Sequence, residues 1–381
     1  MIDFRKMDEI REEELSRHKI SKIRTLKVRN RYHRLNGKNA FRGEHGYGEE
    51  FMVKEIFTDQ GAKGWGLFAG RPCRVDQRAD SLLIGRRVSD IFDTAKGVTE
   101  KEALEYDFAL HDLAGNILNV PVFRMLGAEG SNPIACYDGA ILMDDLSPDG
   151  KPGGLSKILE ECRIDYGMGY RDFKIKIGRA PKWMGWKNGL KRDIEVTRMV
   201  RERYPKAKLM VDANSVYSLE KMLEYVKEVA DCDLYWIEEP FVENRDANRR
   251  LRDFLNEYSP QTMIADGEAE PDVPFLLSLV EEGILDVIQM DIAGYGFTAW
   301  RQLLPVLAEK KVKISPHNWG LKLKTHYTAA LGAAYTHMPT VEGVLDETEG
   351  VNFEEYYLYE GKMTVPDLPG FGMELEWGLE V

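Results

Sequence analysis

From residue 134 onward, short apolar stretches alternate with amphipathic stretches along the chain. This alternation restricts the fold sharply, because strand–helix–strand units build a parallel sheet covered by crossover helices. Eight parallel strands are the number that closes a (β/α) barrel. We predict eight strands, at Ile134–Leu142, Asp172–Ile177, Lys208–Asp212, Leu234–Glu238, Thr262–Glu268, Leu285–Asp291, Val312–His317 and Thr340–Leu345.

An open doubly wound sheet would show the same alternation of strands and helices. That fold usually carries a glycine-rich phosphate-binding turn after its first strand. The turn after the first predicted strand here is Met143-Asp144-Asp145-Leu146, which contains no glycine. We therefore predict a barrel.

The part of the chain before the barrel has a different pattern. Its strands and turn signals indicate an antiparallel hairpin, and its helical spacing ends shortly before Pro121. The sequence thus predicts an α+β unit up to about residue 130. The predicted elements are a strand at 19–31, a hairpin formed by 51–57, the turn 58–61 and 62–68, and a helix at 103–118.

Bulk properties limit the class of partner. The chain has 381 residues, 43% of them hydrophobic and 30% charged, which is enough for a large core. Its formal net charge of -12 argues against a nucleic acid or an anionic membrane as partner. A small anionic substrate stays compatible, because a bound cation can reverse the local potential.

No segment has the features of a targeting or membrane-spanning sequence. The first 18 residues are crowded with charges and lack the apolar centre of a signal peptide. The four cysteines, Cys73, Cys136, Cys162 and Cys232, are scattered and show no CxxC spacing. We expect a soluble cytoplasmic protein with buried, reduced thiols.

Polar residues stand at the ends of consecutive predicted strands. In a barrel, the carboxyl ends of all strands meet at one mouth. On the second strand Lys174 and Lys176 flank Ile175, so both amines project to the same side. The next five strands end in Asp212, Glu238, Glu268, Asp291 and His317. Surface charge placed at random would not keep this phase.

Three carboxylates on neighbouring strands predict a site for a hard divalent cation. Asp212, Glu238 and Glu268 supply the oxygen ligands that Mg²⁺ prefers. Taken singly, each has another explanation: a helix cap, a local ion pair or a solvated surface charge. Glu239 faces away from Glu238 and precedes Pro240, so we interpret it as structural or as a support for a ligand. Asp266 and Glu270 flank Glu268 and have an ambiguous role.

The motifs, taken in order, resemble the mandelate racemase subgroup of the enolase superfamily. The likeness spans nearly the whole chain. It rests on Thr58–Gly66, on Ala109–Gly115 with Pro121 and Met125–Gly127, and on the barrel segments Lys174–Gly178, Val211–Asn214, Trp236–Pro240, Ile264–Glu268 and Ser315–His317.

The resemblance implies a modified (β/α)₇β barrel, at 131–349, that binds Mg²⁺ through Asp212, Glu238 and Glu268. A capping domain, built from residues 1–130 and the tail 350–381, would close over it. The chemistry would begin with removal of a proton beside a substrate carboxylate, which a bound metal ion makes possible by stabilising the enediolate.

The resemblance also implies two acid/base groups on opposite faces of the substrate. One is Lys176, whose pKa the neighbouring Lys174 would lower by like-charge proximity. The other is His317, oriented by Asp291. An electrophile that hydrogen-bonds the substrate carboxylate is expected at the end of strand eight. Glu342 and Glu347 are both candidates, and we favour Glu342.

Substrate contacts are expected from Asn214 and from the glycine-containing loop 42–48, in which Arg42 and His45 stand near the distal end of the substrate. An ordinary exposed loop is the alternative. The Trp-rich connection 179–186 could line the mouth, mediate subunit contacts, or be an insertion whose tryptophans pack on the barrel. His326 and His337 are interpreted as structural, and His33 is left without a role.

Two reactions fit this residue set. Proton exchange across one carbon would racemise or epimerise a 2-hydroxy acid or acid sugar. Loss of a β-hydroxyl with help from His317 would dehydrate an acid sugar, an aldonate or aldarate, to a 2-keto-3-deoxy acid. We favour the dehydratase by family analogy.

A non-catalytic barrel homologue and a metal-dependent aldolase with a Schiff base at Lys176 are weaker alternatives. The resemblance also implies a homo-oligomer.

Overall fold

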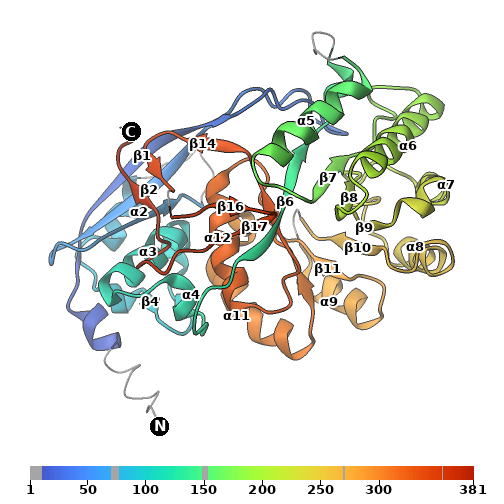
Figure 1. Ribbon diagram of the computed structural model, residues 1–381. Coiled ribbons are helices and arrows are strands. Elements are labelled where there is room, and N and C mark those ends of the chain that lie inside the picture. Colours follow the sequence, from blue (N-terminus) through green and yellow to red (C-terminus); the bar gives the residue numbers. More distant parts are fainter. Residues whose placement is uncertain (1–10, 70–76, 148–152, 269–270, 354) are drawn as a thin grey trace.

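The computed structural model describes residues 11–69, 77–147, 153–268, 271–353 and 355–381. Figure 1 shows a barrel in green to orange beside an α+β capping domain in blue to cyan, which the red C-terminal end of the chain joins. None of the described helices is long and apolar enough to span a membrane.

The capping domain contains an antiparallel sheet. The strands are β1 (Ile20–Tyr32), β2 (Glu50–Thr58) and β3 (Lys63–Leu67), with β14 (Asp346–Thr348) and β19 (Leu379–Glu380) added along β1. The predicted hairpin is confirmed, since Phe57 pairs with Lys63 across a turn in which Gly61 has a φ of 84°. The C-terminal part of the chain thus completes a sheet that the N-terminal part begins.

The helical part of the cap packs against this sheet. Gly64 and Gly66 of β3 allow the close approach of a helix, because a Cβ at Gly64 would lie 2.3 Å from the amide nitrogen of Leu113. The predicted helix at 103–118 is α-helical only from Asp107. The elements are α2 (Gln77–Leu83), η1 (Val88–Asp90), β4 (Phe92–Asp93), β5 (Gly97–Val98), η2 (Lys101–Tyr106), α3 (Asp107–Leu118) and α4 (Val122–Met125).

Eight parallel strands form the barrel. Each predicted strand is present; β9 has its predicted bounds, and the other seven are shorter than predicted. The strands are β6 (Ile134–Ile141), β7 (Phe173–Lys176), β8 (Leu209–Asp212), β9 (Leu234–Glu238), β10 (Met263–Asp266), β11 (Val287–Ile288), β12 (Lys313–Ile314) and β13 (Val341–Gly343). β13 pairs with β6, and the hydroxyl of Ser315 donates to the carbonyl of Thr340 (2.9 Å) between the last two strands. The sheet therefore closes on itself.

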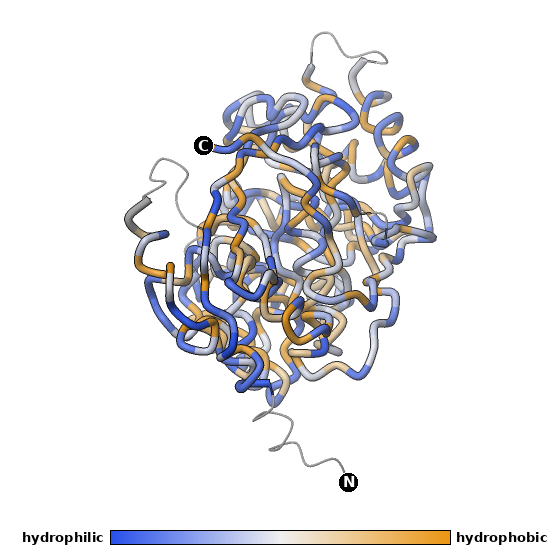
Figure 2. The backbone as a smooth tube through the Cα atoms, turned by 90° about the vertical axis from the view of Figure 1, so that its left-hand side faces the viewer, coloured by the Kyte–Doolittle hydropathy of each residue, from blue (hydrophilic) through white to orange (hydrophobic). Residues whose placement is uncertain are grey.

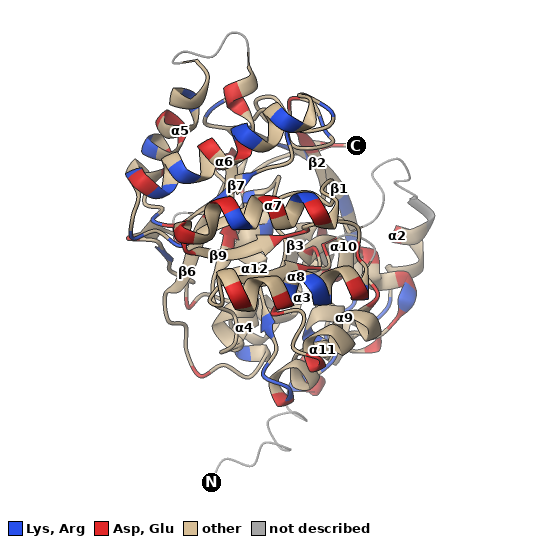
Figure 3. Cartoon of the chain, turned by 90° about the vertical axis from the view of Figure 1, so that its right-hand side faces the viewer, with Lys and Arg blue, Asp and Glu red and all other residues tan. Residues whose placement is uncertain are grey.

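Helices alternate with these strands and cover the outside. Figure 3 shows charged residues of both signs along the outer helices α6 to α8, whereas α8 buries Leu251 and Leu255 on its inner face. The helices are α5 (Leu155–Gly167), α6 (Trp186–Arg203), α7 (Leu219–Val229), α8 (Arg245–Tyr258), α9 (Val273–Glu281), α10 (Ile292–Tyr295), α11 (Phe297–Glu309) and α12 (Lys322–Ala334), with η3 (Asp144–Leu146) and η4 (Ala230–Cys232). This is the predicted (β/α)₇β architecture.

The C-terminal segment contacts both parts of the molecule. Its short strands are β15 (Val351–Asn352), β16 (Leu358–Tyr359), β17 (Lys362–Met363) and β18 (Glu374–Leu375). β17 pairs with the start of β6 in the barrel, while β14 and β19 pair with β1 in the cap. The domain boundaries at residues 130 and 349 stay a prediction.

The core extends through both parts. Figure 2 shows apolar segments in the interior of the molecule. Cys136, Cys162 and Cys232 are buried free thiols, as predicted, and Cys73 lies outside the described residues.

Candidate active site

Three acidic side chains meet at the carboxyl ends of neighbouring barrel strands. Asp212 ends β8, Glu238 ends β9 and Glu268 follows β10 by two residues. One oxygen from each lies within 4.8 Å of the others. Asp212 and Glu238 are buried, and 24% of the Glu268 side chain is exposed.

The donor set fits a small divalent cation. All three groups offer hard oxygen ligands, and their mutual repulsion needs a counter-charge. One carboxylate oxygen of Glu268, Oε2, is buried and has no hydrogen-bond partner among the described residues. A buried acceptor without a donor is costly, and a cation would satisfy it.

Other side chains hold the ligands in place. The Oε2 atom of Glu238 accepts hydrogen bonds from Trp236 Nε1 (3.0 Å) and Gln289 Nε2 (2.8 Å). The backbone amide of Asn214 donates to Oδ1 of Asp212 (2.8 Å). Such outer hydrogen bonds fix ligand orientation. Nothing in the sequence predicts this role for Trp236 or Gln289.

Both predicted lysines lie among these acids. The ammonium of Lys174 is 2.5 Å from Oε1 of Glu238 and 2.7 Å from Oε1 of Glu342. That of Lys176 contacts Oδ2 of Asp212 directly. Both amines are buried.

Lys174 lowers the pKa of Lys176 as predicted, but the neighbouring carboxylates outweigh this effect in the metal-free protein. Burial lowers the pKa, but the contact with Asp212 raises it. Lys174 lowers it as expected, and Glu268 and Glu238 raise it further, so the net pKa lies above its ordinary value. The carboxylates raise the pKa of Lys176 more than Lys174 lowers it. The sequence indicated these carboxylates only as metal ligands, so their effect on Lys176 was not predicted.

His317 and Asp291 form the predicted pair on another side of the mouth. Nδ1 of His317 is 2.9 Å from Oδ2 of Asp291, whose other oxygen accepts the amides of Ala293 (2.9 Å) and Gly294 (2.7 Å) at the start of α10. Burial lowers the pKa of His317, but the charges of Glu268 and Glu342 and the bond to Asp291 raise it to about 9.

Lys324 is a member of this group that the sequence analysis missed. From the first turn of α12 its ammonium reaches Oδ2 of Asp291 (2.7 Å). Burial raises the pKa of Asp291, whereas Lys324 and His317 lower it, and the net pKa is well below its usual range. Lys322 and Lys324 are both helical lysines in the sequence, and no local pattern distinguishes them.

Glu342, the favoured candidate on strand eight, reaches the site, and Glu347 does not. Glu342 is buried, and its Oε2 accepts the amides of Asn318 (2.7 Å) and Trp319 (3.0 Å). Burial raises its pKa, but Lys174 and His317 lower it, with a net decrease. The role of Glu342 as the electrophile that hydrogen-bonds the substrate carboxylate stays a prediction.

A cavity of about 230 Å³ opens beside these groups. The predicted residues that line it come from the barrel and from the loop of the cap, which therefore covers the barrel mouth as predicted. They are Lys176, Asn214, Glu268 and His317 from the barrel, and Arg42 and His45 from the loop.

The loop side chains differ in their setting. Nδ1 of His45 is 2.6 Å from the carbonyl of Gly37, and its ring packs edge-on against Trp319 at 4.4 Å. Burial lowers the pKa of His45 to about 4, so its imidazole is neutral at pH 7. Arg42 is exposed at the rim.

The residues without a predicted catalytic role lie in other surroundings. His326 is buried and stacks on Tyr356 at 4.1 Å, and His337 packs on Tyr335. Glu239 accepts a hydrogen bond from the Asn214 side chain (3.3 Å), and burial raises its pKa to about 9. Asp266 is buried, and Glu270 lies outside the described residues.

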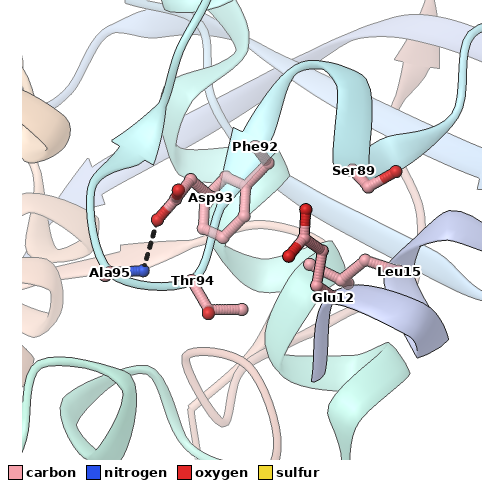
Figure 4. A pocket seen from close by; sticks show the side chains of 7 residues that line it. All are labelled: Glu12, Leu15, Ser89, Phe92, Asp93, Thr94 and Ala95. Carbon is pink, nitrogen blue, oxygen red and sulfur yellow. Dashed lines mark hydrogen bonds between the residues drawn. The ribbon is translucent and has the colours of Figure 1, made fainter. Parts of the chain in front are cut away.

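A second cavity, of about 150 Å³, lies in the N-terminal part and is drawn in Figure 4. Glu12, Leu15 and Phe92 line it. Its Asp93 accepts the amide of Ala95 within its own turn (2.7 Å). The barrel mouth is the better candidate for chemistry, because lysines, a histidine and acids converge there.

Comparisons with known proteins identify the family of this chain. The family model "Enolase C-terminal domain-like" matches residues 157–379. The chain is 27% identical over 354 residues to the D-galactarolactone cycloisomerase of Agrobacterium fabrum, which covers 85% of this chain and 88% of that protein.

Two solved structures of galacturonate dehydratase from Geobacillus sp. are similar over nearly the whole chain. The complex with D-galacturonate and 5-keto-4-deoxy-D-galacturonate has a TM-score of 0.87 and 31% identity, covering 95% of each chain. A mutant complexed with Mg has a TM-score of 0.88 and 30% identity, covering 95% of this chain and 94% of that chain. The protein described here therefore belongs to the enolase superfamily and is mandelate racemase-like.

Proposed function

We propose that this protein is a Mg²⁺-dependent acid-sugar dehydratase. The observation that carries the proposal is that Lys176 and His317 line one cavity beside the acidic triad Asp212, Glu238 and Glu268. The likeness to a galacturonate dehydratase at 31% identity supports the same reaction class. A relative's activity supports a reaction class by analogy only, so the roles below are derived from the residues of this site.

The triad would hold the metal ion. When bound, Mg²⁺ supplies electrostatic stabilisation for the negative charge that develops as the proton beside the substrate carboxylate leaves. Trp236, Gln289 and the amide of Asn214 keep the ligand oxygens oriented.

Lys176 takes the α-proton. Its high pKa in the metal-free protein comes chiefly from Asp212. Neutralising the triad removes the contributions that raise this pKa and leaves burial and Lys174, which both lower it. The amine can then lose its proton near neutral pH and act as a base.

His317 gives a proton to the leaving hydroxyl. The charge of Glu342 and the bond to Asp291 both favour its protonated ring, and its Nδ1 is committed to Asp291. Nε2 is therefore the atom that donates. The β-carbon–oxygen bond breaks, the hydroxyl leaves as water with that proton, and the resulting enol tautomerises to a keto acid.

The substrate class includes uronates as well as the aldonates and aldarates predicted from the sequence. The related structure contains D-galacturonate with its 5-keto-4-deoxy product. That pair fits removal of the proton beside the carboxylate and of the hydroxyl on the next carbon. The same two steps convert an aldonate to a 2-keto-3-deoxy acid.

Epimerisation is the second candidate. The same observation favours it, since two groups able to exchange a proton line one cavity. An epimerase returns the proton from the opposite face and loses no water. The retained triad, lysines and His317–Asp291 pair argue against a non-catalytic barrel.

The test is a screen of the purified protein with Mg²⁺ against uronates, aldonates and aldarates. Keto-acid formation and α-proton exchange in D₂O are followed by NMR in parallel. Keto product from at least one acid sugar is expected. Exchange with inversion and without keto product would replace the dehydratase by the epimerase, and neither signal across the panel would contradict both.

A further inference from the structure

The Trp-rich segment 179–186 connects β7 to α6 and touches the loop that covers the cavity. We infer that Trp183 is a positioning residue that fixes the Asn39–Arg42 wall of the cavity. It thereby sets how tightly the enzyme holds the part of the substrate far from the reacting carboxylate. The effect on substrate binding rests on the proposed function, whereas the fixing of the Asn39–Arg42 wall does not.

The base of the segment is rigid. The guanidinium of Arg179 is fully buried and lies 2.6 Å from Oδ1 of Asp193 and 2.6 Å from Oδ1 of Asp145. Arg192 of α6 adds a contact to Asp145 (3.0 Å). Buried charge pairs with several hydrogen bonds hold one geometry, because any alternative leaves an unpaired charge.

From this base two side chains reach the loop. The indole Nε1 of Trp183 donates to the carbonyl of Asn39 (2.7 Å). The ammonium of neighbouring Lys182 donates to the carbonyl of Phe41. Trp183 is half-buried and Lys182 is exposed, so the indole hydrogen bond is the better protected of the two.

The loop transmits this support to the cavity. Oδ1 of Asn39 accepts the amides of Phe41 (3.1 Å) and Arg42 (2.6 Å), and the amide of Asn39 donates to the carbonyl of Arg42 (3.2 Å). These bonds join residues 39–42 in one tight turn. Because Asn39, Phe41 and Arg42 all line the cavity, a shift of Asn39 moves the whole wall.

Trp183 supports the covering loop at Asn39, and the ammonium of Lys38 lies over its ring at 5.6 Å. On the other side of this loop His45 is held by the Gly37 carbonyl and by Trp319. The reacting groups, Lys176 and His317, stand on the barrel, where they contact Asp212 and Asp291. Loss of the Trp183 bond should therefore weaken substrate binding and spare the chemical step.

Trp183→Phe removes the N–H donor and keeps an aromatic ring. One hydrogen bond of this kind corresponds to a KM increase of roughly threefold to tenfold, with kcat changed less than about twofold. Trp186→Phe is the matched control, since Trp186 packs edge-on against Tyr217 at 5.9 Å, away from the loop. It should leave both constants unchanged. A lower kcat with an unaltered KM in Trp183→Phe would overturn the inference.

Limited trypsin digestion tests the same point without any substrate. Arg42 is exposed in the loop and offers a cleavage site. Cleavage after Arg42, followed by mass spectrometry, should be several-fold faster in Trp183→Phe than in the wild type, and unchanged in Trp186→Phe. Equal cleavage in Trp183→Phe and wild type would overturn the positioning role. Faster cleavage in a protein that turns over no acid sugar would sustain it while the proposed function fails.

Discussion

The ammonium of Lys324 lies 2.7 Å from the Asp291 oxygen that also binds Nδ1 of His317. Lys324 thus fixes the charge and the direction of the carboxylate that orients the histidine. Asp291 is still anchored by two backbone amides through its other oxygen, so loss of Lys324 should impair the pair without destroying it.

We therefore expect Lys324→Met to lower kcat by about tenfold while KM changes little, as expected for a group supporting an acid/base residue. Lys322→Met on the same helix is the matched control, because the Lys322 ammonium lies over the Phe353 ring. Steady-state kinetics on the best acid sugar, with Lys324→Arg as the charge-preserving variant, measure this. Wild-type kcat in Lys324→Met would show that Lys324 has no such role.

Metal binding should depend on the triad. Asp212→Asn removes one negative charge and one strong oxygen ligand, so Mg²⁺ affinity should fall by at least about tenfold to a hundredfold, and activity should be lost. Isothermal titration calorimetry measures the affinity directly. Glu281→Gln, an exposed acid paired with Lys310 on the outer surface, is the control and should bind Mg²⁺ as the wild type does. Unaltered affinity in Asp212→Asn would remove Asp212 from the ligand set.

The ionisation of His317 should respond to the metal. In the metal-free protein its pKa is raised to about 9, so the folded state favours the protonated ring. That contribution to stability is fully present below the unfolded pKa of about 6.5 and is lost as the pH rises through 9. Imidazole NMR signals, assigned with His317→Asn, should titrate near pH 9 and shift to lower pH with Mg²⁺, because the charge of Glu268 is then neutralised. A pKa near 6.5 without metal would contradict the electrostatics described here.

The packing of α3 on β3 should depend on Gly64. A Cβ at this position would lie 2.3 Å from the amide nitrogen of Leu113, too close without a backbone shift. Gly64→Ala should lower the free energy of unfolding by roughly 1–3 kcal/mol, the usual cost of overpacking. Gly130→Ala, where no atom lies within 4 Å of the added Cβ, is the control. Denaturant unfolding would decide, and equal midpoints for the wild type and Gly64→Ala would show that the interface adapts.

Local patterns predicted much of this molecule. The alternation of apolar strands and amphipathic helices predicted all eight barrel strands. The positions of Asp212, Glu238 and Glu268 at the ends of neighbouring predicted strands indicated that their side chains lie close together, and their oxygens do. Such features depend on a strand's own residues and on the rule that parallel strand ends converge.

Other features depend on contacts between distant segments. Nothing near Lys324 in the sequence indicates that it reaches Asp291, and the choice of Glu342 over Glu347 follows from pairing in space, since Glu342 lies opposite Tyr137 of β6 while Glu347 lies opposite Arg31 of β1. The raised pKa of Lys176 likewise sums charges from several strands, which no single motif carries.

The most direct test of the mechanism separates proton removal from loss of water. The measurement is α-proton exchange and keto-acid formation in D₂O, with Mg²⁺ and the best acid sugar, for the wild type, Lys176→Met and His317→Asn. His317→Asn should retain exchange through Lys176 and form keto acid at least about a hundredfold more slowly, whereas Lys176→Met should do neither. Exchange at the wild-type rate in Lys176→Met, or undiminished keto-acid formation in His317→Asn, would contradict the assignment of base and acid.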